Sequence, residues 1–115
     1  MMARILLADD DAATRDLVRR ALATDGHTVS STQDGTEALD KLREAPGGFD
    51  LLITDVQMPG LDGIALAETA LAGSPQLRIV LMSGGKPFPP TGQADHLIRK
   101  PFTAEIIRQV VAKYA

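Results

Sequence analysis

The sequence predicts an α/β fold, in which helices cover both faces of a doubly wound parallel sheet. Short apolar runs without polar alternation, at residues 5–8, 51–53 and 79–82, are typical of strands buried on both faces. Between these runs, apolar residues recur at helical spacing. Strands and helices that alternate in this way form right-handed βαβ units around a parallel sheet.

The individual elements follow in order along the chain. After the first strand, a helical stripe runs to the stop signal at residues 25–26, and residues 27–32 form a weaker, edge-like strand because only Val29 is strongly apolar. Residues 51–53, 79–82 and 97–98 are the third, fourth and fifth strands. The four helical stripes are Leu17, Val18, Ala21 and Leu22; Ala38, Leu39 and Leu42; Ile64, Ala67 and Leu71; and Ile106, Ile107, Val110, Val111 and Tyr114.

One segment interrupts the alternation between the fourth and fifth strands. Residues 84–92 hold three prolines and three glycines. Proline inside a helix removes a backbone hydrogen bond and clashes with the preceding turn, at a cost of about 3 kcal/mol. The helix between these strands is therefore expected to be short, shifted towards residues 93–95, or missing.

Size and composition limit the possible functions. The 115 residues fit one domain, expected to span residues 1–115 with no output domain after the last helix. The net charge of −3 and the absence of a basic cluster argue against nonspecific nucleic-acid binding. The N-terminal apolar run is too short for a signal sequence or a membrane span, and there is no cysteine, so we expect a cytoplasmic protein without a membrane partner.

The candidate chemistry gathers where the predicted strands end. Asp9 and Asp10 follow the first strand, Asp55 the third, Ser83 the fourth and Lys100 the fifth. In open parallel sheets, ligands bind beyond the carboxyl ends of the strands. Three carboxylates in one place repel each other unless a cation lies among them, and an all-oxygen site favours Mg²⁺ or Mn²⁺ over Zn²⁺. Such a site could accept a phosphoryl group on a carboxylate.

Each residue also has an ordinary structural interpretation. An Asp before a helix is most often an N-cap, and either Asp10 or Asp11 could have that role. Ser83 could simply begin a loop, and Lys100 could be a solvated surface lysine. The functional interpretation rests on the placement of all five residues at one end of the sheet.

Four segments carry a resemblance to a known family. Residues 5–11, 55–63, 82–84 and 100–102 resemble the CheY-like receiver domain of two-component response regulators, and the resemblance covers essentially the whole chain. It implies a flavodoxin-like (βα)5 fold with strand order 2-1-3-4-5. The opening residues 2–8 and a non-aromatic residue at position 97 are similar to the CpdR type of stand-alone receiver, which controls substrate delivery to a protease.

The resemblance also implies roles for the site residues. Asp55 would be the phosphoacceptor. Asp9, Asp10, Asp55 and the backbone carbonyl of Gln57 would bind Mg²⁺. Ser83 would be the switch hydroxyl and Lys100 the cation that binds the phosphoryl group, with a cis bond before Pro101. Many receivers have an aromatic residue where this chain has Leu97, which we expect to be a packed apolar side chain on an edge strand.

These roles give a leading functional hypothesis and two alternatives. In the leading one, a histidine kinase or histidine phosphotransfer protein donates the phosphoryl group, and the modified surface binds or releases an output protein, for which a protease adaptor is one candidate. The alternatives are a phosphate shuttle within a phosphorelay and a constitutive, non-phosphorylated binding domain. We expect no enzyme activity beyond self-phosphorylation and self-dephosphorylation, and we assign His27 and His96 to surface or edge-strand positions.

Overall fold

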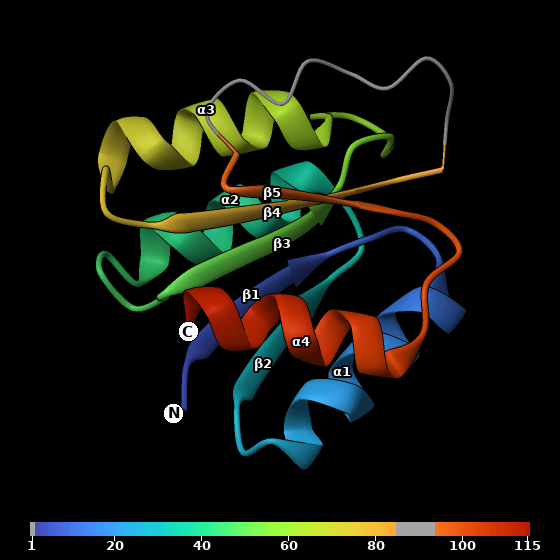
Figure 1. Ribbon diagram of the computed structural model, residues 1–115. Helices are drawn as coiled ribbons and strands as arrows, with labels where there is room; N and C mark the ends of the chain where they lie inside the picture. The colour runs from blue at the N-terminus through green and yellow to red at the C-terminus, as the bar shows by residue number, and fades with distance from the viewer. Residues whose placement is uncertain (1, 85–93) are drawn as a thin grey trace.

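A parallel sheet forms the centre of the molecule (Figure 1). The computed structural model describes residues 2–84 and 94–115. Within them the sheet has five strands in the order β2-β1-β3-β4-β5, which confirms the predicted fold and strand order. The strands are β1 (Arg4–Ala8), β2 (Thr28–Thr32), β3 (Leu51–Asp55), β4 (Arg78–Ser83) and β5 (His96–Arg99).

In the described part of the chain, two helices cover each face of the sheet (Figure 1). Helices α1 (Ala12–Thr24) and α4 (Ala104–Tyr114) lie on one face, and α2 (Gly35–Glu44) and α3 (Gly63–Gly73) lie on the other. The short or missing helix predicted between the fourth and fifth strands falls mainly on residues 85–93, which lie outside the described residues. Among the described residues, no helix is both long and apolar enough to cross a membrane.

Side chains of the central strands alternate between two hydrophobic cores, one on each face of the sheet. In β1, Ile5 and Leu7 pack towards α1 and α4, whereas Leu6 and Ala8 pack towards α2 and α3. All four are fully buried, as expected for a central strand of a parallel sheet. In β2 only Thr32 is buried, which confirms the edge-like character inferred from its sequence.

Each described helix begins with a side chain that accepts a hydrogen bond from its first turn. The N-caps are Asp11 for α1, Asp34 for α2, Asp62 for α3 and Thr103 for α4. Of the two candidates for the first cap, the structure selects Asp11, whose Oδ2 accepts from the Thr14 backbone N–H at 3.3 Å and from the Thr14 hydroxyl at 2.6 Å. The carboxylate of Asp10 is therefore not used as a cap.

Candidate functional site

The strand ends bring the five predicted side chains into one region. Asp9 directly follows β1, Asp55 is the last residue of β3, Ser83 is the last residue of β4 and Lys100 directly follows β5. Backbone hydrogen bonds hold these ends together, with Val56 N–H donating to Met82 O at 2.9 Å and Lys100 N–H to Ser83 O at 2.9 Å. The parallel register thus creates the cluster that was expected from the sequence.

Three carboxylates converge at this edge. Asp9, Asp10 and Asp55 each offer one oxygen, and these oxygens all lie within 4.8 Å of one another. Within residues 2–84 and 94–115, this is the one cluster of three acidic or histidine side chains arranged closely enough to share a metal ion. Its donors are all carboxylate oxygens, which fits a hard divalent cation such as Mg²⁺ and does not fit a metal that needs sulfur or nitrogen ligands.

The three carboxylates differ in burial. Asp9 is 0% exposed and Asp55 is 7% exposed, whereas Asp10 lies at the surface. Burial is the largest influence on Asp55 and raises the pKa of its carboxyl, partly offset by the positive charge of Lys100 and reinforced by the negative charges of Asp9 and Asp10. In the metal-free protein, the Asp55 carboxylate is therefore held in an environment that opposes its charge.

Lys100 supplies the positive charge inside the cluster. Its Nζ donates to Asp9 Oδ2 at 2.8 Å and lies 3.5 Å from Asp55 Oδ2. Burial of the ammonium group would lower the pKa of Lys100, but the hydrogen bond to Asp9 and the charges of Asp9 and Asp55 outweigh it and raise the pKa. The Lys100–Pro101 peptide bond is cis, as the resemblance implied.

Asp9 is fixed by four hydrogen bonds. Its Oδ1 accepts from the Asp11 N–H at 2.9 Å, and its Oδ2 accepts from Lys100. Its own N–H donates to Thr32 O at 3.2 Å, and its carbonyl accepts from Arg15 Nη1 at 2.7 Å. Sequence reasoning did not select Arg15. The sequence did contain one indication of its role: Arg15 is a cation near the N-terminus of a helix, where the helix dipole disfavours positive charge.

The other predicted residues lie around this cluster. Ser83 is 2% exposed at the end of β4. Gln57 is exposed in the loop between β3 and α3, two residues beyond Asp55. Gly63, at the start of α3, lies against the backbone of Asp55, because a Cβ added at Gly63 would come within 2.1 Å of the Asp55 carbonyl oxygen. The two ends of the loop that carries Gln57 therefore lie in backbone contact at Asp55 and Gly63, and only glycine can occupy position 63 at this distance.

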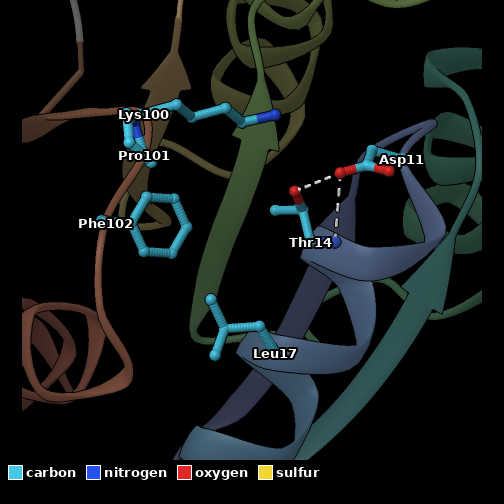
Figure 2. A pocket seen from close by; sticks show the side chains of 6 residues that line it. All are labelled: Asp11, Thr14, Leu17, Lys100, Pro101 and Phe102. Carbon is cyan, nitrogen blue, oxygen red and sulfur yellow. Dashed lines mark hydrogen bonds between the residues drawn. The ribbon is translucent and has the colours of Figure 1, made fainter.

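A groove of about 380 Å³ opens beside Lys100 (Figure 2). One wall comes from α1 and its N-cap, and the other from the segment between β5 and α4 (Figure 2). The residues that line it are Asp11, Thr14, Leu17, Lys100, Pro101 and Phe102. Leu17 and the Phe102 ring make much of the surface apolar (Figure 2). Lys100 also lines the groove, and its ammonium group donates to Asp9.

Comparison with known proteins places this geometry in a family. A family model described as the response regulator receiver domain matches residues 5–112. The chain belongs to the response regulator receiver family. Its function is accordingly that of a phosphoacceptor module in two-component signalling, and these similarities do not favour the phosphate shuttle or the constitutive binding domain.

Relatives of this receiver domain include proteins of different length. The response regulator receiver protein CpdR of Brucella abortus is 42% identical over 83 residues, which cover 72% of this chain and 68% of that protein. The C4-dicarboxylate transport transcriptional regulatory protein DctD of Rhizobium meliloti is 37% identical over 110 residues, which cover 91% of this chain but 24% of DctD. The similarity to CpdR agrees with the type indicated by the opening residues.

Solved structures show the same fold. The chemotaxis protein CheY4 of Vibrio cholerae superposes with a TM-score of 0.86 at 26% identity, covering 100% of both chains. The response regulator TrrA of Thermotoga maritima, solved in complex with Mg²⁺ and BeF, gives a TM-score of 0.88 at 28% identity, covering 97% of this chain and 98% of TrrA. The CheY-like architecture predicted for the chain is thereby confirmed.

Proposed function

We propose that Asp55 of this receiver domain accepts a phosphoryl group from a phosphohistidine in an Mg²⁺-dependent reaction. The observation that carries the proposal is the convergence of Asp9, Asp10 and Asp55 beside the Lys100 ammonium. An Asp55 carboxylate oxygen attacks phosphorus, the bond from phosphorus to the histidine nitrogen breaks, and the histidine recovers a proton. The product is an acyl phosphate on Asp55.

Asp9, Asp10, Asp55 and the backbone carbonyl of Gln57 would hold the Mg²⁺. When bound, this ion supplies positive charge next to the oxygens of the transferred group. The charges of the site support this assignment, since three carboxylates, one divalent cation and Lys100 sum to zero. A relative with the same fold, TrrA, was solved with Mg²⁺ and BeF, and beryllium fluoride has the tetrahedral shape of a phosphoryl group.

Lys100 and Ser83 would bind the transferred group. Lys100 is already within 3.5 Å of Asp55 Oδ2, so a phosphoryl group on Asp55 can reach its ammonium with little movement of the chain. Ser83 is buried at the end of β4, which neighbours β3, and its hydroxyl would donate to a phosphoryl oxygen. Fixed donors aimed at the developing charge are the main source of catalysis in phosphoryl transfer.

The phosphodonor would be a histidine kinase or a histidine phosphotransfer protein that docks over the groove beside Lys100. This groove combines apolar surface at Leu17 and Phe102 with Lys100, whose ammonium group donates to Asp9 of the acidic cluster. Such a donor is charged from ATP, so the receiver would act in the cytoplasm. Phosphorylation would then change the binding of an output protein, for which the similarity to CpdR makes a protease adaptor one candidate.

Intact-protein mass spectrometry tests this proposal. We expect incubation with acetyl phosphate and Mg²⁺ to add one phosphoryl group to the wild type, with no adduct when the metal is chelated. Asp55→Asn should abolish the adduct. Asp62→Asn, which changes a neighbouring aspartate and keeps a good N-cap for α3, should retain it. An adduct on Asp55→Asn equal to that on the wild type would contradict the assignment.

A further inference from the structure

The guanidinium group of Arg15 contacts the backbone of the acidic cluster. Its Nη1 donates to the carbonyl oxygen of Asp9 at 2.7 Å. That carbonyl belongs to the peptide group between Asp9 and Asp10, two of the three converging acids. Arg15 therefore holds the backbone that carries both carboxylates, without being one of the residues that face the cluster.

The position of Arg15 is unfavourable for the helix that carries it. Arg15 is the fourth residue of α1, whose first turn has no acidic residue, and the carboxylate of the N-cap Asp11 accepts from Thr14 rather than from Arg15. Unpaired N–H groups make a helix N-terminus partly positive, so a cation there is disfavoured. Residues that break a local rule often do so for a functional reason, and in this case the hydrogen bond to Asp9 is the compensating contact.

Asp10 is the residue that depends most on this contact. Asp9 has a fixed side chain, because its two carboxylate oxygens accept from Asp11 and Lys100. The Asp10 side chain is exposed and makes no hydrogen bond or ion pair to the described residues. Its direction is therefore set by the backbone on either side, which is held at the Asp9 N–H, the Asp9 carbonyl and the Asp11 N–H.

We infer that Arg15 is a positioning residue for the cation site: by fixing the Asp9–Asp10 peptide group, it aims the Asp10 carboxylate at the position shared with Asp9 and Asp55. This inference rests on the proposed function, because the cation in question is the Mg²⁺ of the phosphoryl-transfer site. Contacts that orient metal ligands typically affect metal affinity by about 10- to 100-fold.

A simple electrostatic role makes the opposite prediction. If Arg15 acted only as a nearby positive charge, its removal would strengthen the binding of a divalent cation. If it acts by orientation, its removal weakens binding. The sign of the change in Mg²⁺ affinity therefore separates the two roles.

The experiment is a calorimetric titration of the metal-free protein with Mg²⁺ at fixed ionic strength. The variants are Arg15→Met, which removes every side-chain donor, and Arg15→Lys, which keeps the charge and the N–H donors of an ammonium group. Arg19→Met is the matched control, because Arg19 lies one turn further along α1 and forms an exposed ion pair with Asp16. Amide hydrogen exchange at Asp11, measured without metal, reports on the order of the loop independently of cation binding.

We expect Arg15→Met to bind Mg²⁺ roughly tenfold more weakly, Arg15→Lys to recover part of the loss, and Arg19→Met to match the wild type. Exchange at Asp11 should be faster in Arg15→Met alone.

Unchanged or tighter Mg²⁺ binding by Arg15→Met would overturn the inference and leave the phosphoacceptor proposal intact. If Arg15→Met does not fold, equal Mg²⁺ affinity and equal exchange in Arg15→Lys and the wild type would overturn it. Absence of Mg²⁺ binding by the wild type would overturn both.

Discussion

Lys100 lies closer to Asp9 than to Asp55. Its ammonium nitrogen is 2.8 Å from Asp9 Oδ2 and 3.5 Å from Asp55 Oδ2, although Asp55 is the proposed phosphoacceptor. In the metal-free protein, Lys100 therefore neutralises part of the charge that Mg²⁺ would neutralise, and it occupies an oxygen of a proposed metal ligand. Lys100 and the cation should compete for Asp9.

This competition gives a prediction for Lys100→Met. Mg²⁺ affinity should rise by roughly tenfold, because the variant removes a positive charge and frees Asp9 Oδ2, and couplings of about 1–2 kcal/mol correspond to factors of that size. The rate of phosphoryl uptake from acetyl phosphate should nevertheless fall. Lys113→Met, at the exposed end of α4, is the control for both measurements. Weaker Mg²⁺ binding by Lys100→Met would show that the two cations do not compete.

Two glycines in α3 give a matched pair of substitutions. A Cβ at Gly63 would lie 2.1 Å from the Asp55 carbonyl oxygen and 3.0 Å from Val56 Cα, both backbone atoms that cannot move aside independently. Gly63→Ala should destabilise the protein by about 1–3 kcal/mol and reduce phosphoryl uptake by displacing Asp55. A Cβ at Gly73 meets nothing within 4 Å, so Gly73→Ala should leave both properties close to wild type.

Urea unfolding of the two alanine variants, read by circular dichroism, measures the difference in stability. Equal unfolding midpoints would mean that the α3 N-terminus can shift away from Asp55 without cost. Phosphoryl uptake measured on the folded fraction separates a displaced Asp55 from simple unfolding.

The raised pKa of Asp55 makes its charge a source of instability. A carboxyl group whose pKa is higher in the folded than in the unfolded protein lowers the free energy of unfolding at every pH above its folded pKa. This destabilisation disappears as the pH falls below the unfolded pKa of 3.8. In metal-free buffer at pH 7, Asp55→Asn should therefore be more stable than the wild type by about 1 kcal/mol. The gain should vanish near pH 3.5, and addition of Mg²⁺ at pH 7 should stabilise only the wild type appreciably. A variant less stable than the wild type at pH 7 would contradict this interpretation.

Asp50 has the opposite pH dependence. Its side chain accepts from the Arg4 side chain at 2.9 and 3.2 Å and from the Arg4 backbone N–H at 2.8 Å, and these contacts lower the pKa of Asp50. A lowered pKa contributes stability above the unfolded value of 3.8, which is lost as the pH falls through the folded pKa. Asp50→Asn should cost about 0.5–1 kcal/mol at pH 7, a modest value because the pair is half-exposed.

Urea midpoints at pH 7 and pH 3 measure this contribution. The difference between Asp50→Asn and the wild type should shrink at pH 3, and Asp40→Asn, on the exposed side of α2, should differ little from the wild type at either pH. If the difference in stability between Asp50→Asn and the wild type stays constant with pH, the loss of stability comes from the hydrogen bond with the Arg4 backbone N–H alone.

Much of the fold was predictable because buried parallel strands have continuous apolar sequences. β1, β3 and β4 coincide with such runs to within two residues, and the positions of Asp9, Asp55 and Ser83 at strand ends follow from them. β5 extends over His96–Arg99, two residues longer than predicted, because pairing with β4 includes residues that are polar or exposed.

Features that depend on a single atom or on tertiary contact were not predictable. Asp11 rather than Asp10 is the N-cap because α1 begins at Ala12, and the composition of this segment does not specify that starting residue. The contact of Arg15 with Asp9 exists only once α1 packs against the end of β1. His27, for which the sequence predicts a surface or edge-strand position, is buried directly before β2, and its Nδ1 accepts from the Ala3 N–H at 2.9 Å. Neutral imidazole has an acceptor that can satisfy a buried backbone donor.

The most direct test of the central proposal locates the phosphoryl group on Asp55 itself. Borohydride reduces an acyl phosphate to the alcohol but leaves a free carboxylate unchanged, so reduction of the phosphorylated protein should convert Asp55 to homoserine. Peptide mass spectrometry should find homoserine at position 55 after incubation with acetyl phosphate and Mg²⁺, and aspartate there when Mg²⁺ or the donor is omitted. Homoserine at Asp9, Asp10 or another position, with Asp55 unmodified in a protein that carries one phosphoryl group, would contradict the assignment.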